Sequence, residues 1–258
     1  GDGVPYTYFN TFDPVVKKDG ESVALIVEHS FDSGHMLTSI SSWREASVDV
    51  VRDNDFTPAD ALGQDYESNQ ENMSQEVRIA SPSGEKFDYV AGLYFFDQEF
   101  FLSEFFDVGP DFCCVPGDRI AGTEHTIEST SYAAFMHSNF HLSEATTLFA
   151  GLRYTQEDQN INSQSGGRAD WIAILNVDIN QRQLDLDSDN VSWTIGLRHN
   201  ITDDAMLYAS ISTGTKAGAF NTAPNLGIGI DPRALSVDDE SITSYEIGAK
   251  TTWYDGRL

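Results

Sequence analysis

Hydrophobic and polar residues alternate along several stretches of the chain with the period of two that is typical of β-strands. The segment from Ser241 to Trp253 shows the pattern most clearly. Aromatic residues near both ends of its apolar face suit a bilayer better than the interior of a soluble sandwich, so the segment predicts a strand in the wall of a transmembrane β-barrel. Its apolar face carries Tyr245, Ile247, Ala249, Thr251 and Trp253, and its polar face carries Ser244, Glu246, Gly248, Lys250 and Thr252.

Other segments repeat this alternation, some strictly and some with apolar residues on the polar face. The segment 191–200 alternates strictly and has an apolar face of Val191, Trp193, Ile195 and Leu197. In the segment 147–157 Phe149 interrupts the polar face, and in the segment 88–99 Val90 and Phe96 do so. A tilted strand crosses a bilayer with about 9–11 residues, and these segments have that length. The repeats together predict an all-β, antiparallel structure of about nine strands.

The connections between these segments fall into two classes. Short links rich in turn-forming residues occur at 31–34, 81–86, 141–145, 200–204 and 254–257. Long polar stretches lie between them, at about 52–71, 104–126, 158–184 and 217–239. Short periplasmic turns and long outer loops are the arrangement of outer-membrane barrels. In that orientation the first strand, near Glu21 to Ser30, runs towards the periplasm.

Composition narrows the function classes. The 258 residues are 40% hydrophobic, yet they contain no apolar run close to the roughly 18 residues of a membrane helix, which excludes helical insertion. Lys and Arg number 15 against 41 Asp and Glu, giving a formal net charge of −26. Such a charge repels phosphate backbones, so nucleic acid is not an expected partner. Much of the acid lies in the long connections, which we interpret as solvated loops.

The two ends of the sequence suggest a piece of a larger structure. The chain begins at Gly1 without an initiator Met or a secretory segment, and it stops at Leu258 after a turn that should lead into another strand. Nine strands is an odd number, whereas bacterial single-chain barrels have an even one, and two unpaired sheet edges are not tolerated in a bilayer. We therefore expect partner strands outside these 258 residues.

Several stretches, in this order and spacing, resemble the barrel of TonB-dependent outer-membrane receptors. The segment 74–84, followed by 87–95, is similar to a mid-barrel hairpin of that family. Three further stretches also resemble the family's barrel. They are 132–135 joined through 141–144 to 148–158, then 207–221, and then 244–250 with 255–258. The resemblance covers roughly residues 21 to 258. It predicts that 1–258 is a partial receptor barrel domain, because the family's plug domain, TonB-contact segment and terminal strand ending in an aromatic residue are not found in it.

The resemblance implies an active transporter and not an enzyme. Such receptors have a 22-stranded barrel with a plugged lumen. They bind a scarce nutrient in the outer loops and move it inward when TonB pulls on the plug. The expected location is the Gram-negative outer membrane, and the expected partners are TonB, outer-membrane lipid and lipopolysaccharide, and a small-molecule nutrient. A siderophore-type iron chelate is the default ligand, while cobalamin and saccharides are equally compatible with the strands. No cofactor is expected.

Polar residues on the predicted inner faces would then hydrate the lumen and hold the plug. The alternative is polar filler without individual roles, because barrel interiors are polar in any case. The candidates are Glu76, Arg78, Arg153, Arg198, Glu246 and Lys250.

Two local features could indicate metal or redox chemistry. The segment 185–190 places Asp at alternate positions, as in a calcium loop, but the twelfth position is Gly196 instead of Glu. We interpret it as a solvated strand extension, with calcium bridging to lipopolysaccharide phosphates as the alternative. Cys113 and Cys114 are adjacent, and His125 alone does not complete a zinc site. In an oxidising outer location we favour a vicinal disulfide over two loop thiols. That disulfide would be strained, because adjacent Cα atoms lie about 3.8 Å apart, below the usual disulfide range of roughly 4.4–6.8 Å.

No catalytic centre is predicted. The six histidines are dispersed, and neither a His-Glu-x-x-His helix nor a nucleophile elbow occurs. Two other classes stay open beside the transporter. A passive outer-membrane pore would have the same strands without a plug, and a soluble acidic calcium-binding β-protein would need no detergent and would fold only with calcium.

Overall fold

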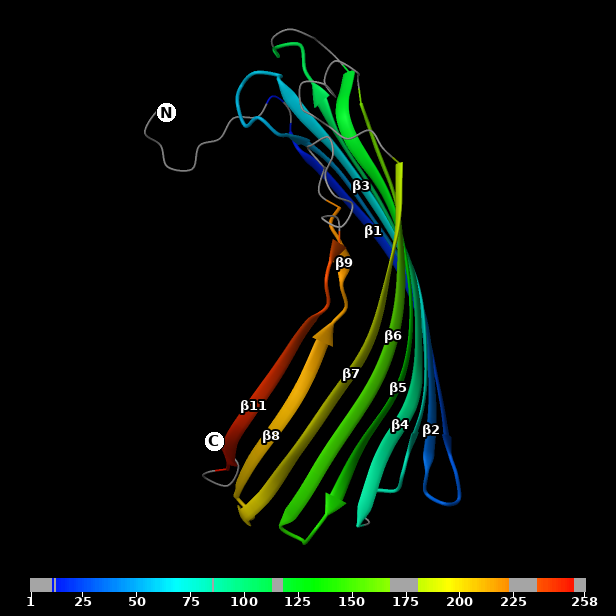
Figure 1. Ribbon diagram of the computed structural model, residues 1–258, viewed down its shortest axis with the longest axis vertical. Coiled ribbons are helices and arrows are strands. Elements are labelled where there is room, and N and C mark those ends of the chain that lie inside the picture. The colour runs from blue at the N-terminus through cyan, green and yellow to red at the C-terminus, as the bar shows by residue number, and fades with distance from the viewer. Residues whose placement is uncertain are drawn as a thin grey trace, which may run out of the picture.

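Nine long strands form one antiparallel sheet in the computed structural model, which describes residues 11, 13–84, 86–112, 118–167, 181–222 and 236–252 (Figure 1). Within these ranges no helix has the length and apolarity needed to cross a bilayer. The strand order is β1-β2-β3-β4-β5-β6-β7-β8-β11, and β9 pairs with β10 in a separate small sheet. The strands are β1 (Val15–Ser30), β2 (Met36–Asp53), β3 (Leu62–Ala80), β4 (Phe87–Val108), β5 (Asp118–His141), β6 (Thr146–Gly167), β7 (Gln181–Thr202), β8 (Ala205–Lys216), β9 (Ala219–Phe220), β10 (Ser236–Val237) and β11 (Glu240–Thr251).

The predicted all-β, antiparallel class is thereby confirmed, and the described main sheet has the predicted nine strands. The sheet is open: β1 pairs only with β2 and β11 only with β8 among the described residues. Tight turns join the strands at one end, where Gly34 and Gly84 take the positive φ angles of 80° and 91° that favour glycine. The predicted turn at 254–257, together with Trp253, lies outside the described residues, as do Cys113 and Cys114.

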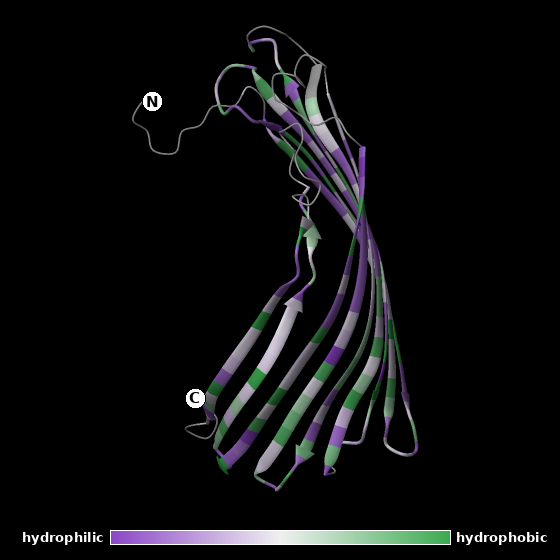
Figure 2. Ribbon diagram, viewed as in Figure 1, coloured by the Kyte–Doolittle hydropathy of each residue, from purple (hydrophilic) through white to green (hydrophobic). Residues whose placement is uncertain are grey.

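The register aligns side chains in rows that run across the strands. Residues paired between neighbouring antiparallel strands point to the same face of a sheet, so each row belongs to one face. One row contains Val77, Leu93, Ala134, Tyr154 and Val191. The next positions along the same strands form a row on the opposite face, which contains Arg78, Gly92, Phe135, Arg153 and Ser192. The sheet therefore has one apolar and one polar face, and Figure 2 shows the resulting alternation along the strands.

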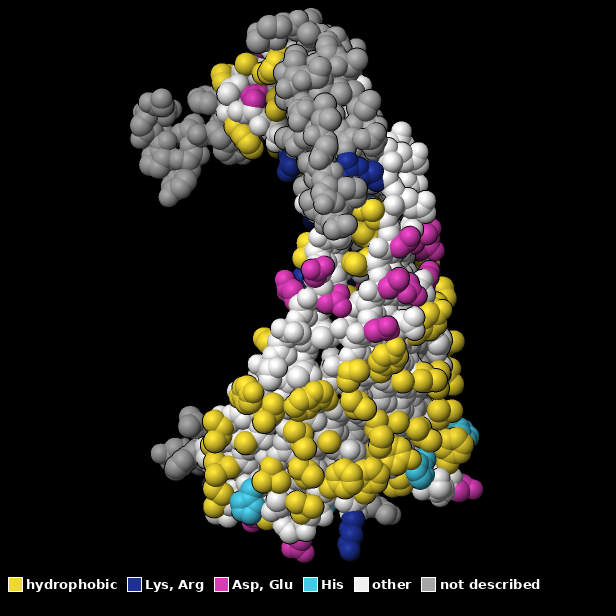
Figure 3. All heavy atoms as spheres, viewed as in Figure 1, with side chains coloured by type: hydrophobic (Ala, Val, Ile, Leu, Met, Phe, Trp, Pro, Cys, Tyr) yellow, Lys and Arg dark blue, Asp and Glu magenta, His cyan; other side chains and the backbone are white. Residues whose placement is uncertain are grey.

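An apolar belt covers the half of the sheet near the tight turns (Figure 3). Its large side chains are exposed, including Leu93 at 65%, Leu152 at 57% and Ile247 at 87%. An exposed apolar surface of this extent indicates a membrane or protein partner. From Leu142 to Tyr132 the chain covers about 33 Å at ~3.3 Å per residue, and a strand tilt of ~40° converts this length to a height of about 25 Å. That height matches the apolar band of outer-membrane barrels.

The strands continue well beyond the belt, which corrects the predicted loop boundaries. The stretch predicted as a loop at 52–71 narrows to 54–61, because β2 reaches Asp53 and β3 begins at Leu62. The predicted loop at 104–126 is also too long, because β4 reaches Val108 and β5 begins at Asp118. The same holds for the predicted loop at 158–184, because β6 reaches Gly167 and β7 begins at Gln181. The first strand begins at Val15 and not near Glu21. Beyond the apolar belt the strands no longer present one consistently apolar face, and the backbone ladder continues without that signal.

Candidate functional site

The polar face of the sheet carries all six residues proposed from the sequence to face a lumen. The register places Glu76, Arg78, Arg153, Arg198, Glu246 and Lys250 on the face opposite the apolar belt. That this face lines a closed lumen stays a prediction, since the sheet is open. The six residues do not form one site but divide into three groups.

The first group combines arginines with aromatic rings. The Nη1 atom of Arg78 lies 3.1 Å from Oε1 of Glu76. The guanidinium carbon of Arg153 lies 5.4 Å from the ring centroid of Tyr94 and 5.8 Å from that of Phe135, within the range of cation–π attraction. Two positive side chains and two rings therefore form one patch across β3 to β6.

Gly92 provides the space for this patch. A Cβ atom at Gly92 would lie 2.6 Å from Cζ of Phe135 and 2.8 Å from the backbone oxygen of Val77. Only glycine therefore lets the Phe135 ring lie against β4. Gly196 and Phe149 repeat the arrangement between β7 and β6.

The second group is a hydrogen-bonded chain near the tight turns. Nη2 of Arg198 donates to Oδ1 of Asn139 over 3.1 Å, and Nδ2 of Asn139 donates to Oδ1 of Asp88 over 2.7 Å. Oδ2 of Asp88 lies 2.7 Å from Nε2 of His141. Sequence analysis missed Asp88, Asn139 and His141, because only the register shows that they meet.

The third group surrounds Tyr208 on β8. Its hydroxyl donates to Oε1 of Glu246 over 2.7 Å, and Nζ of Lys250 lies 5.9 Å from the ring centroid. Glu246 and Lys250 on β11 are thereby tied to the neighbouring strand. The predicted residues Glu246 and Lys250 both contact Tyr208, a residue that the sequence pattern did not single out.

At the opposite end of the sheet, carboxylates organise the connection between β2 and β3. The Asp55 carboxylate accepts hydrogen bonds from the Thr57 hydroxyl at 2.6 Å, the Thr57 amide at 2.9 Å and the Leu62 amide at 2.7 Å. These donors, the Thr57 hydroxyl first, hold the pKa of Asp55 below its ordinary value. The Asp60 amide donates to the Asp111 carboxylate over 3.0 Å, which joins this connection to the one after β4.

The connection between β8 and β11 lies over the polar face of β6 and β7. The Asp239 carboxylate accepts hydrogen bonds from the Ser188 hydroxyl and the Gly218 amide, both at 2.7 Å. These donors lower the pKa of Asp239. Nε2 of Gln159 donates to the Gly218 carbonyl over 3.1 Å. Short strands β9 and β10 within this predicted loop 217–239 were not anticipated.

Two buried polar side chains lie on the same face near these connections. His125 and Thr123 on β5 are each 1% exposed. The Thr123 hydroxyl has no hydrogen-bond partner among the described residues, and the imidazole nitrogens of His125 have none of good geometry, although the Thr222 backbone lies close enough to act on the ring. Burial lowers the pKa of His125, which favours the neutral imidazole. The sequence had weighed His125 only as an incomplete zinc ligand, and no group of three or more metal-binding side chains occurs in the described ranges.

Comparison with known proteins decides the family. The model of the TonB-dependent receptor-like β-barrel matches residues 1–258. The chain belongs to the TonB-dependent receptor family. The resemblance seen in the sequence is thereby confirmed, and proteins of this family are transporters of the Gram-negative outer membrane.

Solved TonB-dependent receptors share the fold at low sequence identity. The ferric yersiniabactin uptake receptor FyuA from Yersinia pestis superimposes with a TM-score of 0.77 at 18% identity, covering 93% of this chain and 34% of that one. The siderophore receptor PiuA from Acinetobacter baumannii gives 0.66 at 15% identity, covering 93% and 38%. The ferric-catecholate import receptor Fiu from E. coli K12 gives 0.64 at 10% identity, covering 97% and 40%. The chain thus spans between 34% and 40% of the length of these receptors.

Proposed function

We propose that the chain forms wall strands of a 22-stranded, TonB-energised receptor in the Gram-negative outer membrane. The observation that carries the proposal is the single sheet with an exposed apolar belt on one face and charged groups on the other. Such a sheet is stable in a bilayer only when its edges are paired and its polar face is enclosed. Membership of the TonB-dependent receptor family and the solved receptors of the same fold support uptake of a large nutrient as the direction of transport.

The polar face would hold the plug domain of the complete receptor. The guanidinium groups of Arg78 and Arg153 have N–H donors left for a further partner. The Glu76 carboxylate holds Arg78 in place, and the rings of Tyr94 and Phe135 hold Arg153. Guanidinium groups bind carboxylates and backbone carbonyls through several donors at once. The plug would therefore meet the wall through acidic or carbonyl groups at this level. The alternative role of these residues, polar filler, predicts that their removal leaves plug binding unchanged.

The ligand would bind at the end of the sheet that carries the connections after β2, β4, β6 and β8, within the ranges 52–71, 104–126, 158–184 and 217–239 that the sequence predicted as outer loops. In the described residues this end contains the ordered Asp55 and Asp239 connections and the buried His125 and Thr123. A siderophore-type iron chelate is the proposed nutrient, because the receptors of the same fold are named for ferric siderophores. Other large nutrients are the competing ligands.

Uptake by the full-length receptor tests this function. Cells that lack their own siderophore receptors would express it in iron-poor medium and receive ⁵⁵Fe bound to catecholate, hydroxamate or carboxylate chelators. We expect uptake of at least one chelate with functional TonB and loss of that uptake in cells without TonB. Equal uptake in both strains would show a passive pore instead. Absence of uptake for every chelate, with the receptor present in the outer membrane, would reject the iron-chelate assignment.

A further inference from the structure

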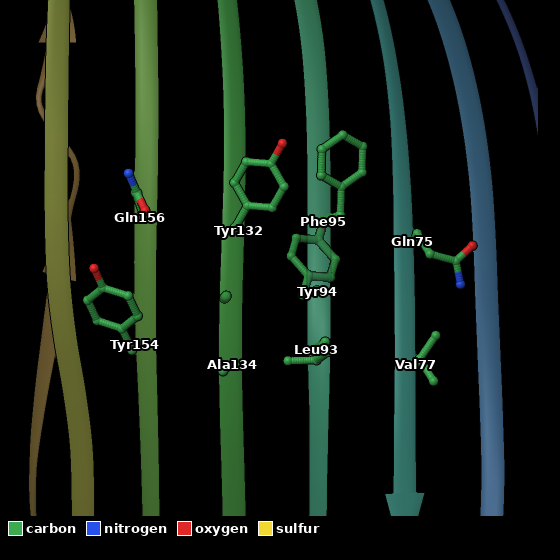
Figure 4. Close-up of a pocket in the computed structure, with 10 residues that line it drawn as sticks. Gln75, Val77, Leu93, Tyr94, Phe95, Tyr132, Ala134, Tyr154 and Gln156 are labelled. Carbon is green, nitrogen blue, oxygen red and sulfur yellow. The ribbon is translucent and has the colours of Figure 1, made fainter.

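The connection between β8 and β11 folds back over the polar face of the sheet. Its described residues are 217–222 and 236–239, and we call them the strap. They contain the short pair of β9 and β10, and Figure 1 shows β9 on the hollow side of the curved sheet. The opposite, apolar face carries Leu93, Tyr132 and Tyr154, which Figure 4 shows on three neighbouring strands. The strap therefore lies on the side of the wall that is proposed to face the lumen.

A carboxylate fastens the strap to β7. Asp239 accepts one hydrogen bond from the hydroxyl of Ser188 on β7 and another from the amide of Gly218 at the other end of the strap, both at 2.7 Å. Ser188 is only 5% exposed. Hydrogen bonds to an ionised acceptor are stronger than those between neutral groups. One carboxylate thus joins the two arms of the strap to each other and to the wall.

Gly218 leaves the strap no room to shift against the wall. Its carbonyl accepts a hydrogen bond from Nε2 of Gln159 over 3.1 Å, so both of its backbone groups are paired. An added Cβ would lie 2.5 Å from the backbone oxygen of Val237 and 2.9 Å from Cδ2 of Leu186. Connections at a surface usually keep their backbone groups in water, whereas Gly218 is buried and paired on both sides. The strap is therefore docked as a part of the fold.

An apolar row crosses the polar face beside these contacts. The register places its members opposite one another across β4 to β7, and they are Phe100, Ile127, Ile161 and Leu184. Ile161 is only 3% exposed. On the far side of this row the Thr222 backbone of the strap lies close enough to His125 to act on its imidazole. Apolar side chains at this point of a polar face favour a docked segment over open water.

The strap lies nearer to the outer entrance than the proposed plug contacts do. Gln159 binds the strap, and Arg153, which is proposed to hold the plug, lies on the same face of β6. The chain between these two residues covers about 20 Å at ~3.3 Å per residue. Because β6 runs from the tight turn through Arg153 to Gln159, a nutrient that enters past the long connections meets the strap before the plug.

From these contacts and this level, we propose that the strap is a fixed constriction of the receptor's outer vestibule, which screens nutrients by size before they reach the plug. The inference rests on the closed, plugged barrel of the proposed function. Such a constriction does not open and close with each nutrient, because its fastenings belong to the wall. Loss of the Asp239 carboxylate frees the strap and widens the passage.

Labelling of a single lumen cysteine from outside the cell tests the proposal. Glu157→Cys, next to Gln159 on the same face of β6, would be introduced into the full-length receptor after Cys113→Ser and Cys114→Ser. Intact cells would receive either a small, membrane-impermeant maleimide or a maleimide that carries a long polyethylene glycol chain. In this parent receptor we expect the small reagent to react readily and the large reagent to react slowly.

Two variants release the strap, and each has a matched control. Asp239→Ala should speed the large reagent at least about tenfold, the change that 1.4 kcal/mol produces, and should leave the small reagent unchanged. Asp238→Ala should behave as the parent, because Asp238 is an exposed strap residue whose carboxylate has no hydrogen-bond partner in the described part of the chain. Gly218→Ala should act like Asp239→Ala, since its Cβ has no space. Gly214→Ala, where the nearest atom would lie 3.4 Å away, should not.

The outcomes separate a constriction from an open wall and from a lid. Equal rates of the large reagent in Asp239→Ala and the parent, with both receptors giving the folded band in gels, would overturn the proposal. Equal rates of the two reagents in the parent would show an open wall, and no reaction of the small reagent would show a closed lid, so either would overturn it too. Labelling needs neither TonB nor a nutrient. A receptor that imports ⁵⁵Fe chelates without size-dependent labelling therefore rejects this inference alone.

Discussion

Close approach of aromatic rings to glycine decides the packing on the polar face. At Gly92 an added Cβ would meet both the Phe135 ring and a backbone oxygen of β3, and backbone cannot move aside cheaply. Gly92→Ala should therefore lower the free energy of unfolding by about 1–3 kcal/mol, the usual cost of overpacking. Thermal unfolding of the full-length protein, followed by the shift of the folded band in gels, measures the effect.

Gly166 provides the control for that substitution. It also lies in a strand, β6, but an added Cβ would meet no atom within 4 Å. Gly166→Ala should leave the unfolding temperature unchanged or raise it slightly, because alanine has less backbone freedom to lose on folding. An equal loss of stability in both variants would refute the packing role of Gly92.

The Asp55 carboxylate makes the connection between β2 and β3 dependent on pH. Its pKa is lowered from 3.8, so its hydrogen bonds contribute stability that is complete above the unfolded pKa and is lost as the pH falls through the folded value. We expect the amides of Thr57 and Leu62 to be protected from hydrogen exchange at pH 6 and to lose this protection towards pH 3. Rates are compared with those of an unstructured peptide at each pH.

Two variants make this exchange experiment specific. Asp55→Asn should reduce the protection already at pH 6 and remove most of its pH dependence. Asp60→Asn should keep both, because the hydrogen bonds of Asp60 to Asp111 come from its backbone. Protection in Asp55→Asn equal to that of the parent protein would contradict the role of the carboxylate.

At the scale of strands, a row of five directly opposed glutamates should cost stability when cations are removed. The row consists of Glu21, Glu45, Glu71, Glu99 and Glu128. Glu99 faces Glu71 on one side and Glu128 on the other, and each opposed pair of like charges costs about 0.2–1 kcal/mol. Glu99→Gln should therefore raise the unfolding temperature in EDTA at low salt, and the gain should shrink in Mg²⁺. Glu240→Gln is the control, because Glu240 faces Lys216 and its neutralisation should bring no gain. A gain independent of cations would argue against the electrostatic account.

Strands could be predicted from the sequence only where one of their faces belongs to the apolar belt. In β7 the outer-face positions from Val191 to Leu197 are apolar, whereas in Gln181 to Asn190 the same face carries Asp185, Asp187 and Asp189, yet both segments belong to one strand. The interpretation of 185–190 as a strand extension was therefore right. Backbone hydrogen bonds, which hydropathy does not record, continue the other strands beyond the belt. The contacts of Asp239 with Ser188 and Gly218 join distant segments and had no local signal.

At the scale of the molecule, charge separates between the two faces of the sheet. Arginines such as Arg78, Arg153 and Arg198 lie on the polar face, while the row of opposed glutamates lies on the other face, beyond the apolar belt. The six polar candidates could be placed on one face from the parity of their positions. Their division into three groups depends on register and on partners such as Asn139 and Tyr208, which parity does not reveal. This separation suits a wall with lipid outside and a plug inside.

Site-directed spin labelling along β7 is the most direct test of this account. Single cysteines from residue 185 to residue 198 would be introduced into the full-length receptor after Cys113→Ser and Cys114→Ser, and the receptor would be placed in lipid vesicles. We predict that oxygen, which concentrates in lipid, relaxes labels at 191, 193, 195 and 197 but not at the even positions between them. Labels at 185, 187 and 189 should respond to a water-soluble nickel reagent. Water accessibility at 191–197 without a period of two would contradict the membrane wall.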